Sequence, residues 1–363
     1  MAKKILHVVG ARPNFMKIAP VMRAIADRTG SLEQMLVHTG QHYDASMSDV
    51  FFEELDIPEA GVNLGVGSGS HAQQTAQVMI RFEPVLQQYA PDWVMVPGDV
   101  NSTLACALVA SKLGFRVAHL EAGLRSFDRS MPEEINRLLT DQLADLLLTP
   151  SSDADENLRR EGIADCKIRM VGNVMIDTLV RLQPKARVRT AALRSQHSLE
   201  GPYVLATLHR PANVDNPRGL QEILGTLNEL ATTLAVVFPV HPRTRQQIAA
   251  LSFTPRPGLR LTNPLGYLDF LALEMGAQLV VTDSGGVQEE TTFLGVPCLT
   301  VRPNTERPVT ITMGTNELVT SAQILEAARR KIDPSSAHPA RIPPLWDGHA
   351  SERIASLLEE GMR

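Results

Sequence analysis

Residues 5–9, Ile-Leu-His-Val-Val, are followed at once by the turn-forming stretch Gly10-Ala11-Arg12-Pro13. A short run rich in Val, Ile and Leu, without polar alternation, is typical of a parallel strand that is buried on both faces. Longer stretches with helical spacing separate this run from others like it. Ten further runs of strand length lie at residues 35–38, 93–96, 116–120, 146–149, 168–171, 204–207, 234–240, 259–262, 279–282 and 298–301.

This alternation predicts an α/β fold built from doubly wound parallel sheets. The pattern occurs twice, so we expect two Rossmann-like domains, one over residues 1–172 and one over 173–345. A short amphipathic helix within residues 346–363 should pack back on the first domain. Ligands of open α/β sheets bind beyond the carboxyl ends of the strands. We therefore expect the two domains to face a common cleft.

Composition excludes several classes of protein. The 363 residues carry 35 Lys+Arg and 40 Asp+Glu, a net charge of −5, which argues against a nucleic-acid binder. No apolar run approaches the roughly 18 residues of a membrane span. The three cysteines, Cys106, Cys166 and Cys298, are far apart and form no metal-binding or disulfide pattern. These features predict a cytoplasmic globular protein.

Three cations follow strand ends. Arg12 and Lys17 lie at and beyond the end of the first strand, where both could lean toward an anionic ligand at a helix start. The alternative is that they are surface charges, which is the commoner fate of a lone lysine. Arg307, in Thr305-Glu306-Arg307-Pro308, is a further cation beside a strand end.

Three carboxylates also follow strand ends of the first half. Asp99 could be a helix N-cap or a functional acid. Glu121 comes directly after a buried strand, where a carboxylate needs a partner or a function. Glu133 could close a capping box, Ser130-Met131-Pro132-Glu133, which would leave Glu134 facing solvent. Taken together, three acids at one edge favour acid–base catalysis.

In the second half, a glycine turn opens a helix after a strand: Asp283-Ser284-Gly285-Gly286-Val287-Gln288-Glu289-Glu290. Ser284, Gly285 and Gly286 could let a phosphate approach the backbone N–H groups of the helix start, and Glu290 could accept ribose hydroxyls. The alternative is an ordinary strand–helix turn that Ser284 caps. No dinucleotide-binding Gly-x-Gly-x-x-Gly follows the first strand, which weakens any hydride-transfer function.

Two histidines, His209 and His241, follow strands of the same half. A single histidine is most often structural, but two at one edge could hold a diphosphate or act on a leaving group. No metal-ligand spacing accompanies them, so no metal is predicted.

These residues, in this order, resemble the non-hydrolysing UDP-N-acetylglucosamine 2-epimerases over essentially the whole chain. The matching stretches are Gly10-Ala11-Arg12-Pro13 with Lys17, Pro97-Gly98-Asp99, His119-Leu120-Glu121-Ala122-Gly123-Leu124-Arg125, Pro132-Glu133-Glu134-Ile135-Asn136-Arg137, His209-Arg210, Val240-His241-Pro242, Thr282-Asp283-Ser284-Gly285-Gly286-Val287-Gln288-Glu289-Glu290 and Thr305-Glu306-Arg307-Pro308. The Glu-Ala-Gly-Leu-Arg stretch followed by Pro-Glu-Glu-x-Asn-Arg is specific to that family.

The resemblance implies a glycosyltransferase-B-like fold and a homodimer. It also implies interconversion of UDP-N-acetylglucosamine and UDP-N-acetylmannosamine without NAD, metal or other cofactor, in the supply of N-acetylmannosamine for surface polysaccharides. By match of motif, it assigns catalytic importance to Asp99, Glu121, Glu133 and His209. It assigns ligand-binding cations to Arg12 and Lys17. It assigns UDP-binding positions to Phe270, Ser284, Gly285, Gly286, Glu290 and Arg307.

The implied chemistry fits the residues. Elimination of UDP from C1 eases removal of the C2 proton and gives a 2-acetamidoglucal, to which UDP then adds back with C2 inverted. Cations and a helix N-terminus suit the leaving diphosphate, and carboxylates suit proton removal and return. We expect Asp99, Glu121 and Glu133 to share the proton transfers.

Two departures from the family pattern stand out. After His209-Arg210 the chain reads Pro211-Ala212-Asn213, so a Glu found in many relatives is missing. The Gln and Arg pattern by which some relatives bind a second substrate molecule does not follow Gln41-His42, so we expect weak or absent substrate activation.

Four rival functions remain open. They are a UDP-sugar glycosyltransferase of the same fold, a 2-epimerase of a UDP-diacetamido uronate, a hydrolysing epimerase, and a sensor that binds UDP-sugar without catalysis.

Overall fold

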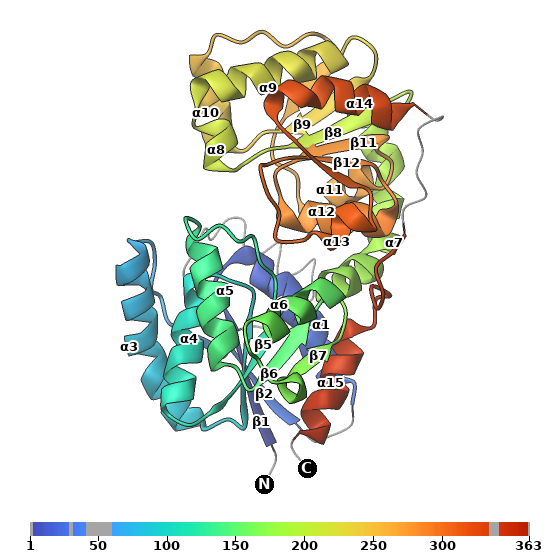
Figure 1. Cartoon of the computed structure of the whole chain (residues 1–363). Helices are drawn as coiled ribbons and strands as arrows, with labels where there is room; N and C mark the ends of the chain where they lie inside the picture. Colours follow the sequence, from blue (N-terminus) through green and yellow to red (C-terminus); the bar gives the residue numbers. More distant parts are fainter. Residues whose placement is uncertain (1–2, 29–31, 41–59, 334–340, 362–363) are drawn as a thin grey trace. The chain divides into compact units, whose positions relative to one another are not determined.

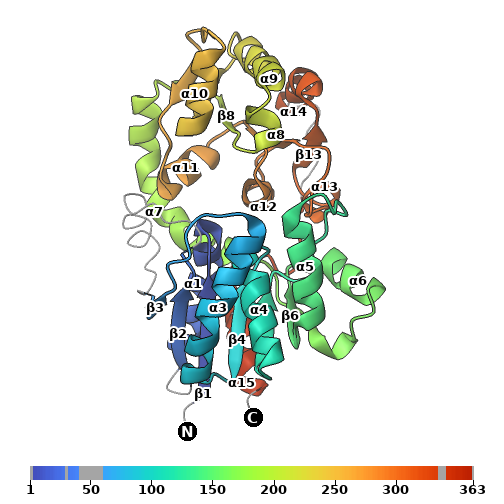
Figure 2. The ribbon, with the colours of Figure 1, turned by 90° about the vertical axis from the view of Figure 1, so that its left-hand side faces the viewer.

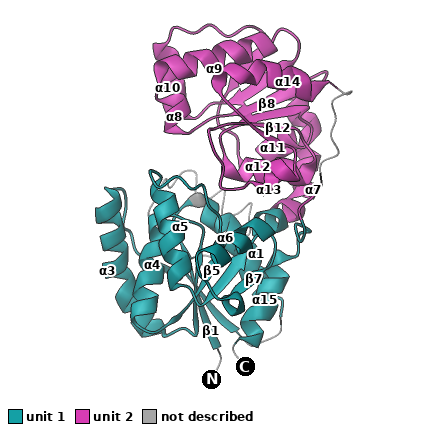
Figure 3. Ribbon diagram, in the orientation of Figure 1, with its two compact units in different colours: residues 1–178, 344–363 teal, residues 179–343 magenta. Residues whose placement is uncertain are grey.

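The computed structural model describes residues 3–28, 32–40, 60–333 and 341–361. The chain divides into two compact units, which Figure 3 distinguishes by colour. Unit 1 comprises Met1–Thr178 together with Pro344–Arg363, and unit 2 comprises Leu179–Pro343. Each unit is a parallel sheet with helices on both faces, as Figures 1 and 2 show from two directions.

Unit 1 contains a seven-stranded sheet in the order β3-β2-β1-β4-β5-β6-β7. All of its neighbouring strands run parallel. Its strands are β1 (Lys3–Val9), β2 (Leu32–His38), β3 (Val62–Asn63), β4 (Trp93–Pro97), β5 (Arg116–Leu120), β6 (Leu146–Thr149) and β7 (Ile168–Met170). Six of them were predicted. The two-residue β3 was missed because it is too short for a hydrophobic pattern.

The helices of unit 1 are α1 (Arg12–Ala26), α3 (His71–Tyr89), α4 (Asn101–Lys112), α5 (Pro132–Leu143), α6 (Ser152–Arg160), a 3-10 turn η1 (Asp165–Lys167) and α15 (Ala350–Glu360). Because β–α–β crossovers are right-handed, α3 to α6 lie on one face of the sheet and α1 lies on the other. Helix α4 packs between α3 and α5. Buried side chains such as Val78, Phe82 and Leu86 of α3 form a core with the strands.

Unit 2 contains a six-stranded sheet in the order β10-β9-β8-β11-β12-β13, again entirely parallel. Its strands are β8 (Tyr203–Thr207), β9 (Ala235–Pro239), β10 (Leu259–Thr262), β11 (Leu279–Thr282), β12 (Cys298–Val301) and β13 (Asn316–Val319). The edge strand β13 was not predicted, because its Asn-Glu start breaks the apolar pattern that marks the other five.

The helices of unit 2 are α8 (Pro211–Val214), α9 (Pro217–Leu230), α10 (Pro242–Ala250), α11 (Tyr267–Glu274), α12 (Gly285–Leu294), α13 (Val309–Thr312), a 3-10 turn η2 (Ser321–Gln323) and α14 (Ile324–Ile332). Helices α9 and α14 pack together over one face of the sheet, where Leu220, Leu224 and Ile324 enter the core. The crossover direction places α11 and α12 on the opposite face.

Two segments connect the units. Helix α7 (Val174–Gln196) begins in unit 1 and ends in unit 2, with Pro184 inside it. The returning chain is anchored in unit 1 by Trp346, whose buried indole Nε1 donates to the Pro150 carbonyl at 2.9 Å. Asp177 then accepts from the backbone N–H groups of Ala350 (3.1 Å) and Ser351 (2.7 Å) at the start of α15. Helix α15 packs against α1.

Within the described ranges, none of the helices has the length and apolar character that crossing a membrane requires.

Candidate active site

The end of β5 carries Glu121 in a strained backbone conformation. Its φ of 69° lies in the left-handed region, where a non-glycine residue costs on the order of 1–3 kcal/mol. The Glu121 carboxylate forms an ion pair with the ammonium group of Lys17, and both side chains are buried. Gly98 makes room for this pair, since a Cβ there would lie 3.0 Å from Lys17 Nζ and 3.4 Å from Glu121 Oε2. The ion pair is therefore built into the turn that precedes Asp99.

The alternative of Lys17 as a surface charge is therefore wrong. Lys17 lies on the buried side of α1, one turn into the helix, and its ammonium group reaches the carboxyl edge of the sheet. Arg12 begins the same helix, but its side chain lies outside the described part of the structure.

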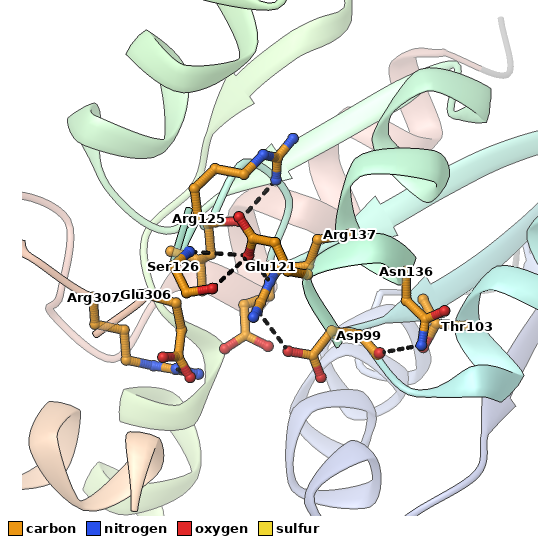
Figure 4. A network of polar contacts seen from close by, with 12 residues as sticks. Asp99, Thr103, Glu121, Arg125, Ser126, Asn136, Arg137, Glu306 and Arg307 are labelled. Atoms are coloured by element: carbon orange, nitrogen blue, oxygen red, sulfur yellow. Dashed lines mark hydrogen bonds and ion pairs between the residues drawn. The ribbon is translucent and has the colours of Figure 1, made fainter. Parts of the chain in front are cut away.

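Asp99 is held by two residues of α5 (Figure 4). Its carboxylate pairs with Arg137 Nη1 at 3.2 Å, and its backbone carbonyl accepts from Asn136 Nδ2 at 2.8 Å. Asp99 is not a helix N-cap, because α4 takes Val100 as its N-cap residue. The remaining terminal nitrogen of Arg137, Nη2, is buried and meets no hydrogen-bond acceptor among the described residues. It is a donor available to a bound ligand.

The predicted roles of Glu133 and Glu134 need correction. Met131, not Ser130, is the N-cap of α5, and no capping box forms. Glu134, expected to face solvent, is 1% exposed. Its carboxylate accepts from the backbone N–H of Ser126 and of Phe127, each at 2.9 Å. Glu134 thus shapes the preceding loop, whereas Glu133 is half-buried in the first turn of α5.

In unit 2, Asp283 is the residue that organises the end of β11. Its buried carboxylate accepts from the backbone N–H of Arg210 at 2.9 Å and pairs with Nδ1 of His209 at 2.9 Å. Burial alone would raise the pKa of Asp283, but the hydrogen bonds from His209, Asn213 and the Arg210 backbone hold it below its ordinary value. His209 is 55% exposed at its side chain, and Nε2 is the ring nitrogen directed away from Asp283.

The Ser284-Gly285-Gly286 turn opens α12, with Ser284 as a cap residue that makes no side-chain cap bond. Gly285 is required there, since a Cβ would lie 2.6 Å from Arg307 Nη1. Arg307 is held by Glu289 at 2.6 Å and by Glu306 at 2.8 Å; Figure 4 shows the last pair. A guanidinium group therefore lies directly beside the glycine turn.

Glu290 is buried in α12 and accepts from the Tyr267 hydroxyl at 2.7 Å. Glu274 is buried as well, and neither of its oxygens meets a donor among the described side chains. Burial is the largest cause that raises the pKa of both carboxyls, and the charge of the neighbouring Glu290 raises the pKa of Glu274 further. The pKa of Glu290 reaches about 7. The two acids therefore hold a proton at a pH where isolated carboxyls are ionised.

The last two predicted site residues are His241 and Phe270. His241 is exposed and caps α10, where its Nδ1 accepts from the Arg243 N–H at 3.3 Å. Phe270 lies half-buried on α11. Gln41 and His42, the positions considered for substrate activation, lie outside the described residues.

Four functional candidates were missed or misread in the sequence: Glu134, Tyr267, Glu274 and Asp283. Asp283 alone carried a usable signal, because an acid directly after a buried strand needs a partner.

In the described ranges, no group of three or more His, Cys, Asp or Glu side chains could hold a metal ion.

The chain has two parallel α/β units. Acids follow the strands of the sheet in unit 1, and a glycine turn follows a strand of the sheet in unit 2. This arrangement places the chain in the glycosyltransferase-B-like fold class. The sequence profile of the UDP-N-acetylglucosamine 2-epimerase family matches residues 24–359. The chain belongs to this family of isomerases.

Individual relatives agree with that assignment. UDP-N-acetylglucosamine 2-epimerase of Methanocaldococcus jannaschii is 41% identical over 99% of both chains. Its crystal structure in complex with UDP-GlcNAc and UDP matches with a TM-score of 0.88, covering 99% of this chain and 100% of that one. UDP-2,3-diacetamido-2,3-dideoxy-D-glucuronate 2-epimerase of Pseudomonas aeruginosa is 43% identical over 98% of this chain and 99% of the relative.

Proposed function

We propose that the protein interconverts UDP-N-acetylglucosamine and UDP-N-acetylmannosamine by inverting C2 of the sugar. The observation that carries the proposal is the buried Lys17–Glu121 pair beside Asp99, in a chain of the 2-epimerase family. A binding protein or a simple glycosyl transferase has no need of acids held at this edge by cations and by strained backbone.

In the first half of the proposed reaction, the bond between C1 and the diphosphate oxygen breaks, and its electron pair leaves with UDP. The proposed sites for UDP are the α12 N-terminus at Ser284–Gly286, with Arg307 beside it. Backbone N–H groups at a helix start and a guanidinium both stabilise negative charge that grows on the leaving diphosphate. Glu290 accepts ribose hydroxyls, and Phe270 contributes to the same binding site.

A carboxylate then removes the C2 proton, and the electron pair of the C–H bond forms the C1–C2 double bond of the 2-acetamidoglucal. Asp99, Glu121 and Glu133 are the proposed proton carriers. Return of a proton to the opposite face of C2, with re-addition of UDP at C1, gives the epimer. Lys17 and the side chain of Arg12 are proposed to bind the anionic ligand.

His209 is proposed to act with Asp283 as its orienting partner. The Nδ1 contact to Asp283 at 2.9 Å fixes the ring, and the exposed side chain leaves Nε2 for the proposed ligand. Such a pair suits proton transfer to, or hydrogen bonding with, the departing diphosphate. His241 has a smaller proposed part, as a contact to the diphosphate.

Proton NMR in D₂O tests the proposal without added NAD or metal. UDP-N-acetylglucosamine should give the manno epimer, with deuterium entering C2 of both sugars. An unchanged, fully protonated substrate would contradict the proposal and favour a sensor or glycosyltransferase. Release of free N-acetylmannosamine would indicate a hydrolysing epimerase.

A second substrate is supported by the 43% identity to the diacetamido-glucuronate epimerase. Parallel assays with both UDP-sugars decide between them: the better substrate is the one with the higher kcat/KM. If deuterium enters the uronate alone, the protein carries out the same proposed reaction on the UDP-diacetamido uronate.

We also propose a homodimer and a cytoplasmic location. Helices α3 and α5, which flank α4, expose Ile80 (62%), Ile135 (43%) and Leu139 (48%), an apolar face that a second copy would cover. Sedimentation of Ile80→Glu and Ile135→Glu should give monomers where the parent chain gives dimers. A parent chain that sediments as a monomer would contradict the dimer.

The proposed cytoplasmic location is supported by the three unpaired cysteines, because free thiols are typical of a reducing compartment.

A further inference from the structure

His119, on β5, is fully buried and makes two short hydrogen bonds. Its Nδ1 lies 2.6 Å from Asp141 Oδ1, and its Nε2 lies 2.7 Å from the carbonyl oxygen of Gly98. Nothing in the proposed reaction uses this residue. It lies behind the edge that carries Asp99 and Glu121.

The partners of His119 define its protonation. A backbone carbonyl only accepts, so Nε2 must carry a hydrogen. Asp141 also accepts from Arg125 Nη2 at 2.7 Å and from the Gly123 N–H at 3.2 Å. Burial works to raise the pKa of Asp141, but His119 and Arg125 outweigh it and hold the pKa below its ordinary value. Asp141 thus contacts His119, Arg125 and the Gly123 N–H, and the His119 ring joins Asp141 to the Gly98 carbonyl.

Next to His119, one guanidinium pairs with two carboxylates. Asp141 lies between His119 and Arg125, and Arg125 is bound in turn by Glu161 through Nε at 2.8 Å and Nη2 at 2.6 Å. These pairs compensate the charge of Arg125.

The contacts of His119 lead to two turns. It binds Gly98 directly, and Gly98, with φ 66°, immediately precedes Asp99. Asp141 accepts from Gly123, two residues after Glu121, which has φ 69°. The ring of His119 and the carboxylate of Asp141 thus connect the turn of Asp99 with the turn of Glu121.

We propose that His119 is a positioning residue: its buried ring, bound to the Gly98 carbonyl and to Asp141, fixes the spacing between the Asp99 turn and the Glu121 turn. This inference rests on the proposed function, in which both acids take part in proton transfer. Misplacing either acid by about 1 Å slows catalysis by on the order of a hundredfold.

Paired substitutions test it. His119→Gln keeps a donor toward Gly98 and loses Asp141, whereas His119→Asn keeps a donor toward Asp141 and loses Gly98. We expect each to lower kcat about tenfold to a hundredfold, with the KM for UDP-N-acetylglucosamine within about twofold, since the proposed UDP contacts lie in unit 2. The matched control Glu161→Gln breaks an ion pair of the same network but reaches neither turn, and should keep kcat within about twofold. Full turnover by both His119 variants would overturn the proposal.

Nitrogen-15 NMR of the histidine-labelled parent protein gives a readout that is independent of activity. The ring of His119, assigned by the signals lost in His119→Gln, should carry hydrogen on Nε2, the nitrogen that faces the Gly98 carbonyl. A ring without hydrogen on Nε2 would overturn the proposal, even if the variants fail to fold. An inactive parent protein that still shows hydrogen on Nε2 would contradict the proposed function and leave the bridge between the two turns intact.

Discussion

The acids of the two units have opposite kinds of neighbour. In unit 1, Glu121 meets the ammonium of Lys17, and Asp99 meets the guanidinium of Arg137. In unit 2, Glu274 and Glu290 lie together, and burial raises the pKa of both. A cation beside a buried acid keeps the acid charged, whereas a second acid keeps a proton on the pair. The first arrangement suits proton transfer, and the second suits hydrogen bonding to a neutral ligand group such as a ribose.

The largest expected effect comes from removing charge at the first edge. Glu121→Gln should lower kcat by about 10²–10⁴-fold, because a proton carrier is lost. Affinity for UDP, measured by calorimetry, should change far less than kcat, because Glu121 is itself no proposed UDP contact and Ser284–Gly286 and Arg307 of unit 2 are retained. Asp165→Asn, which changes an exposed acid of unit 1, is the control. Loss of UDP binding together with turnover would place Glu121 in ligand binding instead.

The next effect concerns Asp283, the charged acid of unit 2. Asp283→Asn should lower kcat by about tenfold to a hundredfold, because His209 loses the partner that orients it. Steady-state rates of Asp283→Asn, His209→Asn and the double variant form a cycle. Since Asp283 acts through His209, the double variant should be no slower than His209→Asn. If the double variant instead loses the product of the two single losses in kcat, the two residues act independently.

A smaller effect is expected at the glycine turn. Gly285→Ala forces the Arg307 guanidinium away, since the new Cβ would lie 2.6 Å from Nη1. UDP affinity should fall about tenfold, equivalent to ~1.4 kcal/mol. Gly225→Ala in α9 is the matched control, because a Cβ there meets nothing within 4 Å. Equal UDP affinities of the two variants would mean that Arg307 does not contribute to UDP binding.

The smallest effect is a pH dependence of stability. Acids whose folded pKa lies above the ordinary value bind their proton more tightly in the folded state, so folding stability falls as pH rises from about 4.5 through about 7. Glu274→Gln removes one acid of the pair and should flatten this decline. Thermal melts between pH 5 and pH 8 should show the variant gaining about 2–4 °C on the parent as pH rises. A difference that is constant with pH would mean that the pair holds no extra proton.

Much of the fold could be predicted because buried parallel strands are continuous apolar runs. The strands that escaped prediction, β3 and β13, lie at sheet edges, where one side of the strand lacks a neighbour and polar residues are tolerated. Prediction therefore succeeded at every interior strand and at the edge strands β7 and β10, and failed at the edge strands β3 and β13.

The site was harder, because partners far apart in sequence decide what a charged residue does. Lys17 and Glu121 are 104 residues apart, and only the fold shows that they pair. Glu134 and Glu133 are neighbours in sequence, yet helix geometry buries one and leaves the other half-exposed. The match to the family motifs located the strand ends that carry the site, but only the three-dimensional contacts show which charged residues pair there.

The return of α15 to unit 1 has a consequence for synthesis of the chain. Unit 2 is inserted into unit 1, between Thr178 and Pro344. The strands of the described ranges, β1 to β13, all leave the ribosome before the helix that packs on α1, and before Trp346 and the N–H groups that Asp177 binds. Unit 2 can therefore complete its fold while unit 1 still exposes apolar surface on α1. Truncation just before Pro344 should yield a chain whose second half is native and whose first half recruits chaperones.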